Sequence, residues 1–175
     1  GGGFFSFTVR ADAKDSNSNA AYLYPEGLGL PDRDYYLLND ATSQEIREKY
    51  KTYITDMLQY IGQTEEEAAK NAETILAFET SLAKPQLDKV ERRDARKTYN
   101  PMSVEQLQKT VPAINWEDYF AEIGAEEVDT VIVSQPKYME ALQNKFAGKD
   151  LQDWKTYLKW TLVNDAAEAL TTEIE

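Results

Sequence analysis

Hydrophobic and polar residues alternate at the start of the chain. Phe5, Phe7 and Val9 are separated by single polar residues, which is the period of a strand with one buried face. Turn-forming residues fill positions 12–19, and the hydrophobic residues of 20–24 follow them. We therefore expect residues 4–24 to form a β-hairpin.

From residue 42 the hydrophobic positions recur every three to four residues, which is the period of a helix. We expect residues 42–175 to be helical, with one further short strand in the β-branched run 128–133. Two capping boxes, Thr42–Glu45 and Thr64–Glu67, predict helix starts. Later helices are expected to begin at Ser103, Asn115, Pro136 and Asp150, and helix ends are expected at Gly62, before Pro85, near Pro112, at Gly124 and at Gly148.

The same pattern predicts which helix faces are buried. The second helix is expected to bury Ala68, Ala72, Ile75, Leu76, Glu79 and Leu82. The last helix is expected to bury Leu151, Trp154, Tyr157, Leu158, Thr161, Leu162, Ala166, Ala169 and Leu170. Trp160 lies about 240° around the helix from Trp154, so we expect Trp160 to be exposed.

The fold class that follows is mainly α, a multi-helix domain with a small N-terminal β-hairpin and one further short strand. Residues 1–175 are expected to form one domain or part of one, and 42% hydrophobic residues suffice for a sizeable core. The β start at Phe4 and a last helix without a stop signal indicate an excised piece of a longer protein, and Gly1–Gly3 is expected to be partly a cloning remnant. No apolar run is long enough to cross a bilayer, so we expect no membrane contact by this segment.

Composition excludes several functions. The chain has 19 Lys and Arg against 31 Asp and Glu, a net charge of -12, which disfavours nucleic-acid binding. It has no His and no Cys, so neither a Ser-His-Asp nor a Cys-His arrangement exists. Zinc sites are also built mainly from these two residue types. We therefore expect no catalytic residue, no cofactor-binding residue and no cofactor in this chain.

One stretch has the spacing of a calcium loop. Asp15, Asn17, Asn19 and Glu26 match positions one, three, five and twelve of an EF-hand. However, Ala20 stands where the loop needs Gly, and no helix precedes it. A polar hairpin loop explains the same residues, so the calcium site is the alternative to that interpretation.

A basic cluster lies at Arg92, Arg93, Arg96 and Lys97. It could bind an anion or RNA, but Glu91 and Asp94 are interleaved with it. We therefore expect these cations to pair within the chain.

The segment 27–37 reads Gly-Leu-Gly-Leu-Pro-Asp-Arg-Asp-Tyr-Tyr-Leu. Its Gly and Pro residues prevent a regular hydrogen-bond ladder, so side chains must satisfy its backbone groups. We expect Arg33 and Asp34 to do this through charge-assisted hydrogen bonds. The structural motif consists of Gly27, Gly29, Pro31, Arg33, Asp34, Tyr35 and Tyr36.

This run resembles a signature of the neprilysin-type zinc metallopeptidases, which include bacterial oligopeptidases. Two further segments match in the same order: Arg92–Ser103, with Tyr99-Asn100-Pro101-Met102, and Leu151–Trp160. One departure is Pro25-Glu26, where the family commonly has Gln and a small residue. The resemblance implies the N-terminal, non-catalytic, substrate-gating region. The family's zinc-binding His-Glu-x-x-His helix lies downstream, so no catalytic residue maps here.

The resemblance implies a function for the parent protein. This piece is expected to cap the active-site chamber of a zinc metalloendopeptidase and to limit the access of peptides. Its partner is then the catalytic zinc domain of the same polypeptide, in a periplasmic, cell-surface or secreted enzyme. The absence of Cys points to a bacterial member, because animal members carry cysteines. The alternative is an autonomous helical module that binds peptides or ligands or serves as a scaffold.

Overall fold

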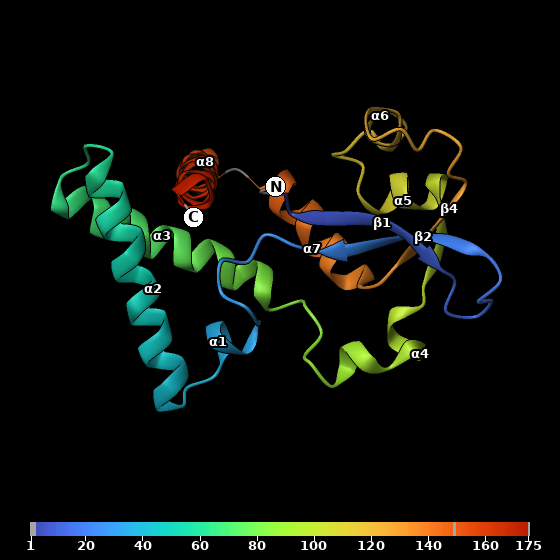
Figure 1. Cartoon of the computed structure of the whole chain (residues 1–175), viewed down its shortest axis with the longest axis horizontal. Helices are drawn as coiled ribbons and strands as arrows, with labels where there is room; N and C mark the ends of the chain where they lie inside the picture. The colour runs from blue at the N-terminus through green and yellow to red at the C-terminus, as the bar shows by residue number, and fades with distance from the viewer. Residues whose placement is uncertain (1–2, 149, 175) are drawn as a thin grey trace. The chain divides into compact units, whose positions relative to one another are not determined.

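The structure is a computed structural model that describes residues 3–148 and 150–174 (Figure 1). The described residues fall into two compact units that interleave along the chain. The helical unit consists of Leu28–Lys84 and the described residues after 148. The mixed unit consists of Gly3–Gly27 and Pro85–Gly148. Hydrophobic periodicity is a local property, and it did not indicate this division.

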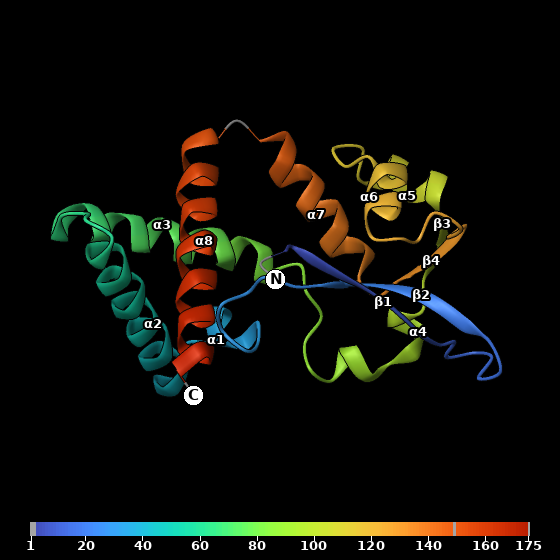
Figure 2. The same ribbon diagram turned by 45° about the horizontal axis from the view of Figure 1, so that its top comes forward.

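The helical unit contains, among its described residues, the helices α1 (Asp34–Leu37), α2 (Ala41–Tyr60), α3 (Glu65–Ala83) and α8 (Leu151–Ile174). α2 and α3 pack against each other, and α8 packs on α3 and on α2. Figure 2 shows α8 crossing α3. The helices expected from the sequence are confirmed as α2, α3 and α8, and α3 ends before Pro85 as expected. The short helix α1 was not expected, because it lies in the segment 27–36 that the sequence predicted to be irregular.

The mixed unit contains a sheet and several short helices. The strands are β1 (Phe5–Ala11), β2 (Asn19–Pro25), β3 (Pro101–Ser103) and β4 (Thr130–Val133), in the order β1-β2-β4-β3. β1 and β2 are antiparallel, β2 and β4 are parallel, and β4 and β3 are antiparallel. The helices are η1 (Glu91–Arg93), α4 (Ala95–Thr98), α5 (Val104–Thr110), α6 (Trp116–Glu122) and α7 (Pro136–Ala147).

The hairpin and the later strand are confirmed, and so is the mainly α fold class. β3 was not expected. Its three residues lack the length and the alternation that reveal a strand in a sequence, and they become a strand by pairing with β4.

The two faces of the sheet are covered by different segments. Phe5 and Phe7 of β1 contact Trp116 and Phe120 of α6, with ring centroids 5.3 and 5.4 Å apart. Val9 follows the same alternation but is 58% exposed, because β1 is an edge strand. The opposite face carries Tyr22 and Tyr24, whose side chains alternate with those that face α6.

Helix caps agree with the sequence at most positions. Thr64 forms the capping box that the sequence predicts, and the expected helix starts at Ser103 and Asn115 are N-caps, Ser103 within a capping box of its own. The expected cap at Thr42 is wrong, because α2 begins earlier: the Asp40 carboxylate accepts hydrogen bonds from Ser43 N (2.9 Å) and Ser43 Oγ (2.7 Å). Asp is as good an N-cap as Thr, so periodicity alone does not choose between the two.

The predicted buried face of α8 is partly wrong. Tyr157 is buried as expected, but Leu151, Leu158 and Leu162 are 70%, 46% and 72% exposed. Trp160, which was expected to be exposed, is 2% exposed and packs on Tyr50 and Tyr53 of α2. The aromatic rings of α2 and α3 determine which side of α8 is covered, and these contacts are distant in sequence. The side chain of Leu170, the end of the predicted stripe, lies outside the described residues.

The buried face predicted for α3 agrees with the structure. On this helix Leu76 is half-buried, and the other predicted positions are buried: Ala68, Ala72, Ile75, Glu79 and Leu82. None of the described helices combines the length and apolarity needed to cross a membrane.

Candidate functional site

A buried carboxylate is the centre of the candidate site. Glu79 lies in the last part of α3, in the helical unit, and its side chain is 1% exposed. Its position follows from the hydrophobic face of α3, on which it occupies the same side as Ile75 and Leu82. No Lys or Arg pairs with it among the described residues; its partners are hydroxyl and backbone groups.

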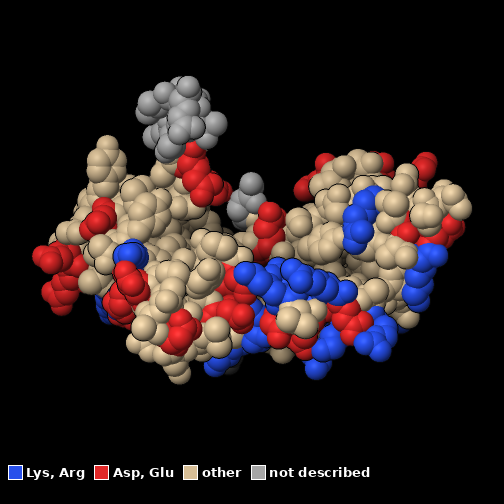
Figure 3. Space-filling view, turned by 60° about the horizontal axis from the view of Figure 1, so that its bottom comes forward, with Lys and Arg blue, Asp and Glu red and all other residues tan. Residues whose placement is uncertain are grey.

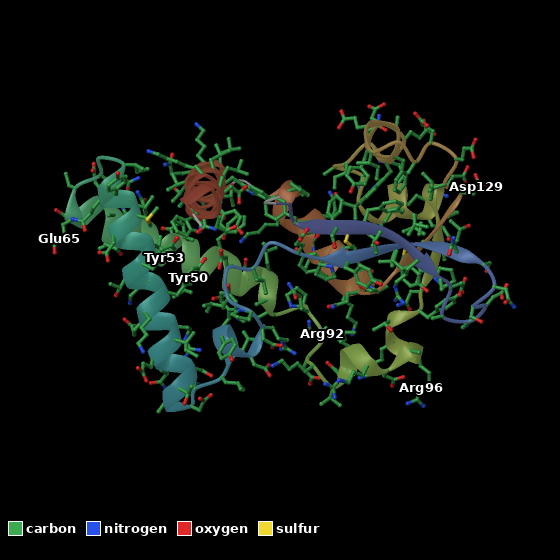
Figure 4. The ribbon with its side chains drawn as sticks, viewed as in Figure 1. Tyr50, Tyr53, Glu65, Arg92, Arg96 and Asp129 are labelled. Atoms are coloured by element: carbon green, nitrogen blue, oxygen red, sulfur yellow. The ribbon has the colours of Figure 1, made fainter. Side chains whose placement is uncertain are left out.

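Three hydrogen bonds reach the Glu79 carboxylate. The Tyr36 hydroxyl donates to Oε2 over 2.6 Å, the Tyr50 hydroxyl donates to Oε1 over 3.0 Å, and the Gly29 N–H donates to Oε2 over 3.3 Å. The Tyr36 hydroxyl also accepts a hydrogen bond from Leu30 N, 2.8 Å away. Figure 4 labels Tyr50 and Tyr53 on α2, on the side toward α3. The carboxylate therefore joins α2, α3 and the segment that contains Gly29, Leu30 and Tyr36.

Glycine is required at the point where this segment passes Tyr50. A Cβ atom at residue 29 would stand 1.9 Å from Tyr50 Oη and 2.5 Å from its Cζ. Gly27 has a φ of +93°, a conformation that other residues rarely adopt, and a Cβ there would stand 2.6 Å from the carbonyl oxygen of Gly3. The two glycines of the motif thus serve close approach and backbone conformation respectively.

The rest of the motif is held by a different set of side chains than expected. Arg47 of α2 donates to the carbonyl oxygens of Tyr35 (2.6 Å) and Leu38 (2.8 Å). The buried Asp32 accepts a hydrogen bond from Asp34 N over 3.0 Å. Arg33 Nε is buried and has no hydrogen-bond partner among the described residues. The pinning role expected of Arg33 and Asp34 is therefore taken by Asp32, Tyr36, Arg47 and Glu79.

Hydrophobic packing completes this region. Leu30, Tyr36 and Ala83 form a buried cluster, against which further side chains pack: Leu28, Tyr35, Leu37, Ile46, Tyr50 and Leu76. Pro31 is exposed, so its contribution is to the backbone conformation rather than to the core.

Burial dominates the electrostatics of the site. Desolvation raises the pKa of Glu79 from 4.5 to about 7, although its three hydrogen bonds oppose this shift. Desolvation and, after it, the charge of Glu79 raise the pKa values of Tyr36 and Tyr50 far above their ordinary value. Both tyrosines are thus neutral donors at any physiological pH, and Glu79 is the one group of the three that titrates there.

The arrangement ties three segments of the helical unit together. The Glu79 carboxylate is enclosed, and within the described part of the chain its hydrogen-bond partners are two tyrosine hydroxyls and one backbone N–H, with no cation among them. Within residues 3–148 and 150–174, no three His, Cys, Asp or Glu side chains are grouped so that they could hold a metal ion.

The calcium candidates do not come together. Asp15 and Asn17 lie in the turn between β1 and β2, where the Asp15 carboxylate accepts hydrogen bonds from Asn17 N and Ser18 Oγ, each over 3.1 Å. Asn19 begins β2 and Glu26 follows its last residue. An extended strand of that length places these two residues about 20 Å apart, so they do not share an ion.

The basic cluster pairs within the chain. The Arg96 guanidinium donates from Nε and Nη2 to the two carboxylate oxygens of Asp94, each over 3.0 Å, and Lys97 Nζ lies 2.6 Å from Glu91 Oε1. The pairing expected from the interleaved charges is thus confirmed for these two cations. Figure 3 shows Lys and Arg side chains with Asp and Glu side chains among them.

Sequence reasoning placed Glu79 on a buried face without recognising its role. An acidic residue among Ala, Ile and Leu on one helix face is the available signal, because such a residue needs partners. Tyr50, Arg47 and Asp32 carry no comparable signal, since only tertiary structure brings them to the motif.

The chain resembles known peptidases over its whole length. The family described as peptidase family M13 matches residues 1–175. Endothelin-converting enzyme 1 of Homo sapiens is 33% identical over 172 residues, which are 95% of this chain and 22% of that protein. An endothelin-converting enzyme homolog of Locusta migratoria is 30% identical over 183 residues, which are 97% of this chain and 25% of that protein.

Solved structures agree. The zinc metalloprotease Zmp1 of Mycobacterium tuberculosis, in its open state, matches with a TM-score of 0.80 and 31% identity, over 91% of this chain and 25% of that one. PepO of Lactobacillus rhamnosis HN001 matches with a TM-score of 0.66 and 21% identity, over 93% of this chain and 26% of that one, which shows a shared fold. The chain spans between 22% and 26% of the length of these proteins.

Proposed function

The chain belongs to peptidase family M13 and corresponds to its N-terminal region, and on this premise we propose that it is part of the helical domain that caps the active-site chamber of a zinc metalloendopeptidase. In this proposal the chain limits which peptides reach the active site and supplies no catalytic residue. The zinc, its ligands and the general base come from the catalytic domain of the same polypeptide.

The observation that carries the proposal is the family match over residues 1–175, together with the small share of each relative that the chain covers. Proteins named as endothelin-converting enzymes and a zinc metalloprotease align with this chain over less than a third of their own length. A chain without His or Cys lacks the usual zinc ligands. Both the partial alignment and the absence of His and Cys are consistent with a parent enzyme in which another region binds the zinc.

The structure of the motif supports a role that depends on shape. A size filter needs rigid walls rather than reactive groups. The capped helices α2 and α3 are tied to the motif through Glu79, Tyr36 and Tyr50. Such a buried hydrogen-bond network favours one arrangement of these elements over others.

We also propose that the parent enzyme acts outside the cytoplasm, in the periplasm, at the cell surface or in the medium, and that it is bacterial. The absence of Cys and the resemblance to Zmp1 of Mycobacterium tuberculosis support a bacterial source, and the proposed location rests on what the family resemblance implies. Fractionation of source cells with an antibody against this chain tests it, and a purely cytoplasmic signal contradicts it.

The gating role is tested in the full-length peptidase. Glu79→Ala removes the acceptor of all three hydrogen bonds and should loosen the cap without touching the zinc site. The matched control is Glu66→Ala, an exposed residue of the same helix. For each enzyme, kcat/KM is measured with a short peptide and with a long one, and the zinc content is measured by elemental analysis.

We expect Glu79→Ala to keep its zinc and its turnover of the short peptide while its preference between short and long substrates changes. The proposal fails if the ratio of the two kcat/KM values stays the same although the melting temperature of the variant has dropped. The isolated 175-residue chain should cleave neither peptide in the presence of zinc. Saturable peptide binding by the isolated chain would instead favour an autonomous binding module.

A further inference from the structure

The mixed unit contains a small cavity that has no part in the proposed gating of peptide access. Its volume is about 140 Å³, and it lies between the face of the sheet that carries Tyr22 and Tyr24 and the segment of η1 and α4. Its lining includes Arg10, Tyr22, Arg92, Tyr99, Ser134 and Gln135. Figure 4 labels Arg92 in the segment that leads into α4.

Arg10 of β1 is held in place beside this cavity. Its guanidinium carbon lies 3.9 Å from the centroid of the Tyr22 ring, and its Nε donates to Tyr24 Oη over 2.7 Å. The two tyrosine rings are stacked on each other, with an interplanar angle of 8°. Among the described residues no carboxylate pairs with Arg10, so the two terminal nitrogens keep their donors for another acceptor.

Ser134 provides a second donor and an independent observation. It directly follows β4, is 3% exposed, and its backbone N–H donates to the carbonyl oxygen of Leu23 over 3.0 Å. Its Oγ is buried and has no hydrogen-bond partner among the described residues. A buried hydroxyl without a partner is costly, and an acceptor inside the cavity would remove that cost.

Gln135 adds a third donor. It is 7% exposed, and its Oε1 accepts a hydrogen bond from Leu87 N over 2.8 Å. This bond fixes the orientation of the carboxamide and leaves its NH₂ group as a donor.

The lining is cationic and rich in donors. It contains Arg10 and Arg92 and neither Asp nor Glu. Asp12, which directly follows β1, already accepts hydrogen bonds from Tyr99 Oη (3.1 Å) and from Lys14 N (2.8 Å). A site that presents a fixed guanidinium, a hydroxyl and an amide NH₂, without an anion of its own, is complementary to an oxyanion.

We propose that this cavity binds a small oxyanion, a carboxylate or a phosphate group, with the Arg10 fork as its main contact and Ser134 Oγ as a donor to it. The cavity volume limits the size of the ligand, because pockets that hold drug-sized ligands have volumes of about 300 Å³ or more. The proposal concerns a separate site and does not depend on the gating role.

The test uses the 175-residue chain labelled with ¹⁵N. It is titrated with acetate and with phosphate, and with chloride at matched ionic strength as the control anion. The signals followed are the Nε–H of Arg10, the side-chain amide of Gln135 and the backbone amide of Ser134. We expect saturable shifts of these signals with acetate or phosphate and none with chloride. The comparison of the two dissociation constants identifies which oxyanion the site prefers.

Three variants assign the effect. Arg10→Met should raise the Kd at least about tenfold, because a charge-assisted bidentate contact is lost. Ser134→Ala should raise it less and preserves the packing. Arg96→Met is the matched control, since Arg96 is exposed and paired with Asp94 outside the cavity, and its Kd should equal that of the parent chain.

Amide dispersion verifies that each variant is folded, and Ser134→Ala, the smallest change, decides the test if Arg10→Met does not fold. Shifts that do not saturate, that chloride reproduces, or that persist with the same Kd in Ser134→Ala and in Arg10→Met would overturn the proposal.

Discussion

At the scale of single residues, the most consequential group is a carboxylate that sequence reasoning treated as part of a hydrophobic face. Glu79 is buried in the helical unit and accepts hydrogen bonds from Tyr36, Tyr50 and Gly29. Its pKa is raised to about 7, so its protonation state changes near neutral pH. This property makes the stability of the unit depend on pH in a window where few other carboxylates titrate.

The first prediction concerns that dependence. Because the pKa of Glu79 rises from 4.5 to about 7 on folding, the folded state binds more protons between these values. The free energy of unfolding should therefore fall as pH rises from 4.5 to 7, with a slope of at most about 1.4 kcal/mol per pH unit. Urea unfolding at several pH values measures this slope.

Glu79→Gln should remove the slope, and Glu66→Gln, which changes an exposed carboxylate, should keep it. Asp40 and Glu67 have lowered pKa values and act in the opposite direction, since their contribution is lost as pH falls through their folded pKa. The pH range in which Asp40 and Glu67 change stability therefore lies below the range in which Glu79 does. The same slope in both variants between pH 5 and 7 would contradict the assignment to Glu79.

The second prediction concerns Gly29. Gly29→Ala should lower the free energy of unfolding by about 1–3 kcal/mol, because its Cβ would displace Tyr50 from Glu79. Gly148→Ala is the control, since Gly148 is exposed at the end of α7 and has an ordinary φ of -67°. Thermal unfolding followed by circular dichroism compares them. Equal melting temperatures would show that Tyr50 moves aside without cost.

At the scale of elements, helix boundaries depend on capping groups that compete within a few residues. Thr64 caps α3 as its capping box predicts, and Ser103, an expected helix start, caps α5. At the start of α2 two residues that can serve as N-cap, Asp40 and Thr42, lie two positions apart. In the structure the N-cap is Asp40. The sequence thus locates the helix but does not choose its cap.

The third prediction follows from that choice. Asp40→Ala should cost about 1 kcal/mol of stability, because the first turn of α2 loses its side-chain acceptor. Thr42→Ala should change stability by at most a few tenths of that amount, since Thr42 is an exposed position within the helix. Urea unfolding of both variants at neutral pH measures the difference. A larger loss in Thr42→Ala would contradict the structural assignment of the cap.

At the scale of the whole molecule, α8 leaves an apolar strip in solvent. Leu151, Leu158 and Leu162 recur at intervals of seven and four residues, so they share one face of the helix, and each is exposed. Exposed apolar strips of this kind mark contact surfaces. In the proposed function, the remainder of the peptidase is the partner that covers it.

The fourth prediction uses the absence of cysteine from the chain. Leu158→Cys and Leu162→Cys should react quickly with a maleimide in the isolated chain and much more slowly in the full-length peptidase. Glu66→Cys, at an exposed position of α3, serves as the control. In the parent enzyme, any native cysteines are first replaced. Equal labelling rates in the two proteins would show that the strip stays exposed and would weaken the proposed domain contact.

The sequence by itself determined what depends on neighbours along the chain. The hairpin, the capping box at Thr64, the end of α3 before Pro85 and the irregular backbone of residues 27–33 all follow from local rules of backbone geometry. The family also follows from the sequence, because the motif that identifies it is contiguous.

Tertiary structure alone decided the rest, because those features join residues that are distant in sequence. β3 exists through its pairing with β4, and the covered side of α8 is the one that meets aromatic rings from α2 and α3. Glu79 obtains its partners from residues 29 to 50 positions away along the chain. Periodicity predicts that a face is buried, but which groups meet in the interior is set by the packing of whole elements.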